Sequence, residues 1–514
     1  MNRRDFIRLA GLGAAGLMLG GCGSSAGRVP VSANKKYPNI IYILADDLGY
    51  GDVSCLNENG RIKTSHIDSI AKEGMVFTEM HSGSAICTPT RYGILTGRYC
   101  WRRLKKGAVE GDSPHLIEDG RMTVASMLKM QGYHTACIGK WHLGMDWQKK
   151  NDNPEDIDFT KPVLHGPNTN GFDYSFCIPA STDMPPYVYV QNGAVTAVPN
   201  RVVKGTTGKL LLREGPTGAD FEHVEVLSKL TEKAVAYIDQ RSREDKPFFL
   251  YFSLTAPHTP ILPAEEFQGK SGTNEYGDFV LQVDWTVGQV LKAIEQNGLE
   301  NNTLIIFTND NGPSPNADFD ELAAVGHHPA YVFRGHKADI FDGGHRVPFI
   351  ARWPGKIKPA SVCDQAACLT DLMATAADIT GCKLPDNAGE DSVSILAAMT
   401  GTAAAPLREA VVHHSVNGSF AIRQGKWKLI FCPDSGGWSP PKPDSAEARG
   451  LPAVQLYDMS DDVGEQQNLY QKYPDVVRRL TELLERYVRN GRSTPGIPQK
   501  NNYTVEIIRK IDRT

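Results

Sequence analysis

Two pairs of oxygen-bearing side chains each follow a short apolar run of the sequence. Asp46 and Asp47 follow one such run, and Asp310 and Asn311 follow another. Carboxylate and amide oxygens suit a hard cation such as Ca²⁺ or Mg²⁺ better than they suit zinc. One adjacent pair of acids is more often a turn or a helix cap. Two clusters after two apolar runs favour a cation site instead.

A cysteine with an arginine four residues later is the second candidate for chemistry. The segment Cys87–Arg91 reads CTPTR, and Pro89 fits the first turn of a helix. Cys87 would then lie at a helix N-terminus beside Arg91, where positive potential stabilises an anion. Cys87 is either a structural cysteine in a loop or a nucleophile, and no Cys-His-Asn arrangement of the peptidase kind accompanies it.

Three more polar groups follow apolar runs in the same way. Lys140 and His142 come after one run, and His258 comes after another. In an open parallel sheet, ligands bind at the carboxyl ends of the strands. If these strands are parallel neighbours, all of these groups meet at one edge of the sheet.

The elements that would position these residues alternate between strand and helix. Short continuous apolar runs are typical of strands that are buried on both faces, and the alternation implies crossover units. We therefore predict an α/β fold with a mostly parallel sheet and helices on both faces. The predicted strands are 39–44, 134–138, 248–253, 303–307 and 347–351, and the predicted helices are 64–73, 123–131, 222–243, 279–297 and 364–380.

The pattern changes from about Arg408 onward. Short strands separated by turn residues are followed by an amphipathic helix at 474–489, which indicates a small antiparallel sheet with one helix. Residues 433–450 form a long loop rich in Pro, Gly and Ser, and loops of this length are often functional. We predict a catalytic domain at 38–405 and a C-terminal α+β subdomain at 406–514.

The amino-acid composition excludes some classes of protein function. The 514 residues carry 55 Lys and Arg against 59 Asp and Glu, a net charge of −4, which argues against a dedicated nucleic-acid binder but not against a local basic cluster. The content of 41% hydrophobic and 22% charged residues is that of a globular protein. Ten cysteines without a CxxC pair make a zinc site a poor fit and identify no disulfide.

The N-terminus is interpreted as a targeting signal. Residues 1–22 carry Arg3 and Arg4 before a Gly/Ala-rich apolar run too short to span a membrane, which resembles a twin-arginine export signal. The run ends in LGGC at Cys22 and resembles a bacterial lipobox; a plain cleaved signal is the alternative. Residues 23–37 would be a tether. The prediction is an exported protein of the periplasm or cell envelope, handled by export machinery and bound to the membrane only through a lipid on Cys22.

The motifs together resemble the sulfatase family, within the alkaline-phosphatase-like fold. The family signature is Cys (or Ser)-x-Pro-x-Arg followed by Leu-Thr-Gly-Arg, and residues 87–98 contain both parts. The full ordered set of matching segments is far more specific than any one of them. The segments are 45–52, 87–98, 139–144, 256–260, 308–312, 334–337, 341–348, 426–430, 456–458 and 465–469.

The resemblance implies a nucleophile and a metal site. Cys87 would be oxidised to formylglycine by a maturation enzyme, and its hydrated form would attack sulfur and also donate an oxygen to the ion. Asp46, Asp47, Asp310 and Asn311 would be the other ligands of one Ca²⁺, with Mg²⁺ as an alternative.

The resemblance also implies roles for the flanking side chains. Arg91 would favour the hydroxylate, while Lys140 and Lys337 would hold sulfate oxygens and stabilise charge in the transition state. His258 would protonate the departing alcohol, and His142 would take a proton from the second hydroxyl.

Several positions depart from the family pattern or fit it weakly. Thr90 stands where Ser or Ala is commoner, and Asp342 stands where Glu is usual. His345 and Arg346 could bind sugar hydroxyls, although Arg346 could equally pair with a carboxylate of the core. His413, His414 and Trp438 would suit contact with a carbohydrate ring, but surface or hairpin roles are expected for each of them. A rim loop is expected at 183–187.

The predicted substrate is a sulfated carbohydrate, and two rivals remain. A phosphate or phosphonate ester hydrolase of the same fold would often bind two metals through additional His and Asp ligands, whereas this ligand set favours one. A catalytically silent binding protein would need a broken set of catalytic groups, and none is missing.

Overall fold

The computed structural model describes residues 36–153, 156–403 and 406–508. The predicted signal, with Cys22, and nearly all of the predicted tether lie outside the described residues. Within the described ranges, no helix has the length and apolarity needed to cross a membrane.

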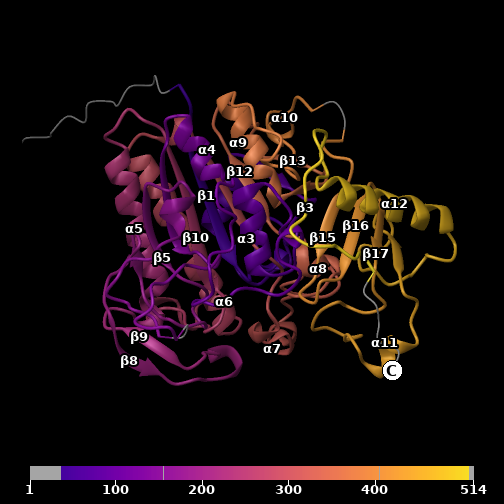
Figure 1. The fold of residues 1–514 in the computed structure, drawn as a ribbon, viewed down its shortest axis with the longest axis horizontal. Helices are drawn as coiled ribbons and strands as arrows, with labels where there is room; N and C mark the ends of the chain where they lie inside the picture. Colours follow the sequence, from indigo (N-terminus) through magenta and orange to yellow (C-terminus); the bar gives the residue numbers. More distant parts are fainter. Residues whose placement is uncertain (1–35, 154–155, 404–405, 509–514) are drawn as a thin grey trace, which may run out of the picture.

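One large sheet forms the centre of the molecule (Figure 1). Its middle is parallel: β11, β1, β10, β4 and β5 are successive parallel neighbours, as predicted. The strand predicted at 347–351 joins as β12, which runs antiparallel to β11. In spatial order the strands are β13 (Ser361–Cys363), β2 (Met75–Phe77), β12 (Phe349–Arg352), β11 (Thr303–Asn309), β1 (Asn39–Asp46), β10 (Phe248–Pro257), β4 (His134–Lys140), β5 (Tyr174–Ile178), β6 (Val190–Gln191) and β7 (Ala194–Val195).

Helices cover both faces of the sheet, which explains why its central strands are apolar throughout. Along β1, Tyr42 and Leu44 face one core and Ile41 and Ile43 face the other, because successive side chains of a strand point to opposite faces. The helices on the first face are α3 (Cys87–Thr96), α4 (Val124–Met130) and α9 (Leu372–Thr380), and those on the second are α2 (Ser65–Lys72), α5 (Val226–Arg241) and α6 (Glu275–Gln296).

Two helix boundaries differ from the predicted ones for local reasons. α6 begins four residues before the predicted start because Asn274 caps it, accepting hydrogen bonds from the backbone N–H groups of Tyr276 and Gly277. α9 begins only at Leu372, since Asp371 accepts a hydrogen bond from the Cys368 amide and holds the preceding turn. The stretch before it contains the short strand β14 (Ala367–Cys368).

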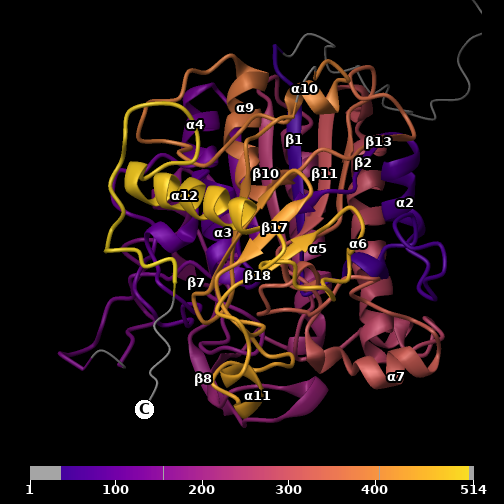
Figure 2. The ribbon, with the colours of Figure 1, turned by 90° about the vertical axis from the view of Figure 1, so that its right-hand side faces the viewer.

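A separate antiparallel sheet forms beyond residue 410, again as predicted. Its strands are β15 (Val411–His414), β16 (Phe420–Gln424), β17 (Trp427–Ile430) and β18 (Gln455–Asp458). Figure 2 shows α12 (Pro474–Asn490) lying across β17. The apolar residues under α12 pack with Tyr99 and Trp101 of the larger part, so the two parts share a core.

Smaller elements surround this frame. They are β3 (Met80–His81), which pairs with β14; the hairpin β8 (Pro199–Val203) and β9 (Gly215–Gly218); and the short helices α7 (Phe319–Ala324), α8 (Asp342–His345), α10 (Leu396–Met399) and α11 (Ala446–Arg449).

Candidate active site

The two predicted oxygen clusters meet because β1 and β11 are parallel neighbours. Their register pairs Ala45 with Asn309, so the residues that follow each strand are adjacent. The Asn311 amide Nδ2 donates to Asp47 Oδ1 over 2.8 Å, and the Asp47 amide donates to Asp310 Oδ1 over 3.4 Å. Asp47 has a φ of 64°, in the left-handed region that residues other than glycine rarely adopt.

Helix α3 brings a thiol and a cation to the same edge. The helix begins at Cys87, as the sequence predicted, and Arg91 lies one turn further on and is fully buried. The Arg91 Nη2 atom lies 2.7 Å from Asp310 Oδ2 and 3.6 Å from Asp46 Oδ2. Its Nη1 atom donates to the Ser253 hydroxyl. The guanidinium therefore holds carboxylates from two different strands in place.

Two buried lysines complete the cationic side of the site. The Lys140 ammonium lies 2.6 Å from Asp46 Oδ2 and 2.8 Å from the Ser181 hydroxyl. The Lys337 ammonium lies 2.8 Å from Asp47 Oδ2. Three carboxylates (46, 47 and 310) thus face three cations (91, 140 and 337), so their formal charges cancel.

Two histidines flank these charges. His258 Nε2 lies 3.6 Å from Asp47 Oδ2, and Nδ1 donates to the Thr259 carbonyl over 2.8 Å. His142 Nε2 donates to the Val109 carbonyl over 2.8 Å, so the neutral ring presents a lone pair at Nδ1. That Nδ1 atom is buried and has no partner among the described residues. Burial and the Lys140 charge hold the pKa of His142 well below its usual range.

The charged groups of the site shift one another's pKa values. Burial opposes ionisation of Asp46, but Lys140, His258 and Arg91 outweigh it and lower the pKa of Asp46. Burial and repulsion from Asp46 raise the pKa of Asp310 to about 7. Burial also raises the pKa of the Cys87 thiol, against the opposing effect of Lys140 and Lys337. An unmodified thiol at this place is therefore a neutral group and a poor nucleophile.

The oxygen set fits a hard divalent cation. Asp46 Oδ1 and Asn311 Oδ1 are buried side-chain oxygens without a hydrogen-bond donor in the described part of the chain. Ligand atoms of Asp46, Asp47 and His258 lie within 4.8 Å of one another. Three carboxylates and an amide carbonyl are the donors that Ca²⁺ or Mg²⁺ takes. A bound cation would satisfy oxygens that are otherwise costly to bury.

Two of the predicted sugar-binding residues lie elsewhere. His345 is fully buried, with its ring stacked on His413 at a centroid distance of 3.7 Å. Arg346 lies 2.6 Å from Glu79 and 3.4 Å from Asp342, so the pairing with core carboxylates is the alternative that the structure shows. A sugar-binding role for either residue is not supported by these contacts.

The structure adds three residues that the sequence reasoning missed. Ser181 lies just beyond β5 and contacts Lys140, Asp183 lies 3.9 Å from His258 Nδ1, and Ser253 receives the Arg91 guanidinium. Ser253 lies inside β10 but at the end of the predicted strand 248–253, so a search for polar residues at the ends of predicted strands would have found it. Asp183 lies in the predicted rim loop and has no such signal.

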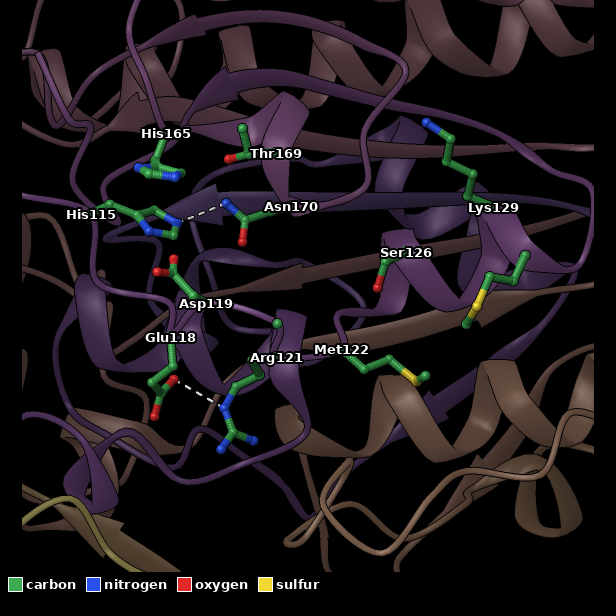
Figure 3. Close-up of a pocket in the computed structure, with 12 residues that line it drawn as sticks. His115, Glu118, Asp119, Arg121, Met122, Ser126, Lys129, His165, Thr169 and Asn170 are labelled. Atoms are coloured by element: carbon green, nitrogen blue, oxygen red, sulfur yellow. Dashed lines mark hydrogen bonds and ion pairs between the residues drawn. The ribbon is translucent and has the colours of Figure 1, made fainter. Parts of the chain in front are cut away.

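A surface pocket of about 510 Å³ is distinct from this site. In this pocket Glu118 pairs with Arg121 and His115 contacts Asn170 (Figure 3). None of its lining residues belongs to the predicted site.

Comparison with known proteins decides the family. The sulfatase family model matches residues 38–382. The chain belongs to the sulfatase family. This sulfatase is 35% identical to the N-acetylgalactosamine-6-O-sulfatase of Bacteroides thetaiotaomicron, over 88% of this chain and 93% of that protein. It is 32% identical to human arylsulfatase A, over 87% of each chain.

A solved structure agrees with the sequence relatives. A protein described with the metabolism of multiple glycosaminoglycans by Bacteroides thetaiotaomicron is 34% identical and superposes with a TM-score of 0.77. The match covers 88% of this sulfatase and 99% of that chain. The predicted family and the predicted fold class are both confirmed.

Proposed function

We propose that this sulfatase releases inorganic sulfate from a sulfated carbohydrate, with Cys87 as formylglycine and one Ca²⁺ (or Mg²⁺) beside it. The observation that carries the proposal is the meeting of the α3 N-terminus with two oxygen clusters and two lysines from separate strands and loops. When the modification and the ion are present, they supply an attacking hydroxyl and a positive charge next to it. Asp46, Asp47, Asp310, Asn311 and the modified Cys87 would hold the ion.

The charge balance of the site favours an anionic substrate. The three carboxylates and three cations cancel, so a divalent ion leaves a net charge of about +2 in a buried pocket. Lys140 and Lys337 can then bind sulfate oxygens, because a bound metal would offset the negative charge of Asp46 and Asp47, the carboxylates that these ammonium groups face. Charge that develops on sulfate in the transition state meets donors that are already in place.

The two histidines take different proton-transfer roles. The His258 imidazole is fixed by its Nδ1–H bond to Thr259, so Nε2 faces the charged groups. When the ring is protonated at both nitrogens, Nε2 can give its proton to the departing alcohol. The lone pair of His142 Nδ1 can accept a proton from the modified Cys87, and its low pKa keeps it unprotonated at neutral pH.

The relatives point to the alcohol that carries the sulfate. The named function of the bacterial relative is removal of sulfate from O6 of N-acetylgalactosamine, and 35% identity over 88% of the chain supports the same substrate class here. We therefore propose a 6-sulfated N-acetylhexosamine within a glycosaminoglycan fragment. A formylglycine-generating enzyme is the required maturation partner.

Export is proposed on the sequence alone. The paired arginines and the LGGC segment support a lipid anchor on Cys22 at the cell envelope. In a bacterial host, Cys22→Ser is expected to move the protein from the membrane fraction to the soluble fraction. An unchanged distribution would contradict the anchor.

The test of the catalytic proposal is sulfate release measured by ion chromatography. Protein matured with a formylglycine-generating enzyme is expected to act on N-acetylgalactosamine 6-sulfate, and to favour nitrophenyl sulfate over nitrophenyl phosphate. Mass spectrometry of the Cys87 peptide is expected to show loss of the thiol. A preference for the phosphate ester would contradict the proposal and support the phosphate or phosphonate ester hydrolase. Activity confined to aryl sulfates would contradict a carbohydrate substrate.

A further inference from the structure

A half-exposed arginine is tied to the alcohol side of the active site. The Arg213 side chain is 44% exposed, and its Nη1 atom lies 2.6 Å from Oδ2 of Asp183, which is only 4% exposed. The other oxygen of the same carboxylate lies 3.9 Å from His258 Nδ1. One buried carboxylate therefore links Arg213 to the imidazole that faces the departing alcohol.

The base of Arg213 is rigid while its head faces solvent. The Arg213 backbone N–H donates to the Asp183 carbonyl over 3.1 Å, and the Arg213 carbonyl accepts from the Tyr187 hydroxyl over 2.7 Å. Arg213 Nη1 also donates to the Asp183 carbonyl over 3.3 Å. No acceptor for Arg213 Nε or Nη2 occurs among the described residues. A guanidinium held at one edge in this way presents its other edge as a two-pronged anion site.

The proposed chemistry indicates where the free edge of the Arg213 guanidinium lies relative to the substrate. The alcohol that leaves must lie within hydrogen-bond reach of His258, so the sugar ring lies beside His258. Arg213 belongs to the connection between β8 and β9, and Figure 1 shows this hairpin on the same side of the molecule as α7, which follows β11. Asp183 thus ties the guanidinium to the His258 side of the site, where the sugar would lie, whereas the two buried lysines would hold the sulfate.

We propose that Arg213 binds a second anionic group of the substrate, a carboxylate or a further sulfate on the sugar next to the one that loses its sulfate. Asp183 acts as the positioning residue for this contact. The inference rests on the proposed carbohydrate sulfatase activity and adds to it a preference for polyanionic fragments. Glycosaminoglycans carry such groups on neighbouring sugars, which is why the contact would select them over singly charged esters.

The test compares substrates that share one sulfate ester and differ in the second acid. The set is N-acetylgalactosamine 6-sulfate alone, the same sugar joined to a hexuronic acid, that disaccharide as its methyl ester, and a disulfated disaccharide without uronate. Arg213→Gln is expected to lower kcat/KM about 10- to 100-fold for substrates with the recognised acid, mainly through KM. It is expected to change kcat/KM less than about threefold for the monosaccharide and the methyl ester.

Matched variants separate recognition from general charge. Lys204 is exposed on the same hairpin connection, so Lys204→Gln removes one positive charge without touching Asp183. It is expected to leave the ratio between acidic and esterified disaccharides unchanged. Arg213→Lys is expected to keep part of that ratio, and Asp183→Asn to reduce it in the same direction as Arg213→Gln. If Arg213→Gln loses activity on the disaccharide with a uronate, the recognised group is the carboxylate. If it loses activity on the disulfated disaccharide, the recognised group is the second sulfate.

Three results would overturn the proposal. One is an equal loss on all substrates, another is no loss on any, and the third is the same loss with Lys204→Gln. If the wild-type protein cleaves none of these esters, the proposed function fails separately. Binding of the acidic and esterified disaccharides to Cys87→Ala, measured by calorimetry with and without Arg213→Gln, then still decides whether Arg213 discriminates between them.

Discussion

Two buried clusters in this sulfatase have the same formal charges but different contacts. The catalytic cluster joins Asp46, Asp47 and Asp310 with Arg91, Lys140 and Lys337. The histidine cluster joins Glu79, Asp342 and Glu465 with Arg346, Arg423 and Lys428, around His81, His345 and His413. Each contains three carboxylates and three cations, and each is assembled from segments far apart in the sequence.

The clusters differ in which atoms have partners. In the histidine cluster, Lys428 lies 2.8 Å from Asp342 and 2.7 Å from Glu465, and His81 Nδ1 lies 3.3 Å from His345 Nδ1. Both clusters contain buried atoms without a hydrogen-bond partner in the described ranges: Asp46 Oδ1, Asn311 Oδ1 and His142 Nδ1 in the catalytic cluster, and His413 Nε2, Arg423 Nη1 and Glu465 Oε1 in the histidine cluster. Charge balance and unpartnered atoms are therefore common to both. Glu465 Oε1 is the oxygen that faces the Lys428 ammonium at 2.7 Å. The catalytic cluster differs in that its unpartnered atoms include both a carboxylate and an amide oxygen, the donors that a hard cation takes.

Ring geometry argues against a metal in the histidine cluster. His345 and His413 are stacked with an interplanar angle of 9°. An imidazole lone pair lies in the plane of its ring, so two parallel stacked rings cannot both direct lone pairs at one ion. The cluster instead joins β15 and β17 to the loops around α8.

The largest expected effect separates Cys87 from the other buried cysteines. Cys87→Ala is expected to abolish sulfate release, because it removes the proposed nucleophile at the α3 N-terminus. Cys432→Ala, at a cysteine that is equally buried, is expected to keep full activity. Turnover of nitrophenyl sulfate measures both, and residual turnover by Cys87→Ala at the wild-type rate would place the nucleophile elsewhere.

Metal content is expected to distinguish the two clusters next. Elemental analysis of purified protein is expected to find one Ca²⁺ or Mg²⁺ per chain and no zinc. Asn311→Ala is expected to lose the ion and to lower kcat by roughly 10²-fold or more, since one ligand and one hydrogen bond to Asp47 disappear. His413→Gln is expected to keep the ion. Stoichiometric zinc that disappears with His413→Gln would reverse the assignment.

Two buried lysines provide a matched comparison. Lys337→Met is expected to lower kcat about 10²- to 10³-fold by removing a donor to sulfate, with little change in stability when the ion is bound. Lys428→Met leaves Glu465 buried without its cation and leaves Asp342 with only its longer contacts to Arg346 and Arg423, so it is expected to lower the free energy of unfolding by about 3–5 kcal/mol. Denaturation midpoints and kinetics on the same preparations measure both. The comparison fails if the two variants lose the same property.

The smallest expected effect is a pH dependence of stability. Burial, with the charges of His81 and Lys428, holds the pKa of His413 well below its usual range. The unfolded chain binds a proton at this residue below a pH of about 6.5 and the folded chain does not, so stability falls as pH falls. Between pH 7.5 and 5.5, the wild type is expected to lose about 1 kcal/mol more than His413→Gln. Parallel pH profiles from chemical denaturation would contradict this.

Much of the catalytic cluster was predictable because it depends on a simple rule. Polar residues follow apolar strands, parallel strands end at one edge, and Asp46, Asp310, Lys140 and His258 obey both conditions. The expected sugar contacts of His345 and Arg346 rested on proximity in sequence to Lys337, which says nothing about the direction of a side chain. The turn of α8 directs His345 toward Lys428 of β17, and Arg346 contacts Glu79. The role of Asp183 could not be predicted from the sequence, because it depends on contacts between two loops.

The burial of Cys87 limits when the proposed modification could occur. Only 4% of this residue is exposed once α3 has packed against the sheet, so the proposed maturation enzyme would have to reach the thiol while the segment is still extended. Modification would then compete with folding during synthesis. On this proposal, incubating the folded protein with the maturation enzyme is expected not to raise the active fraction.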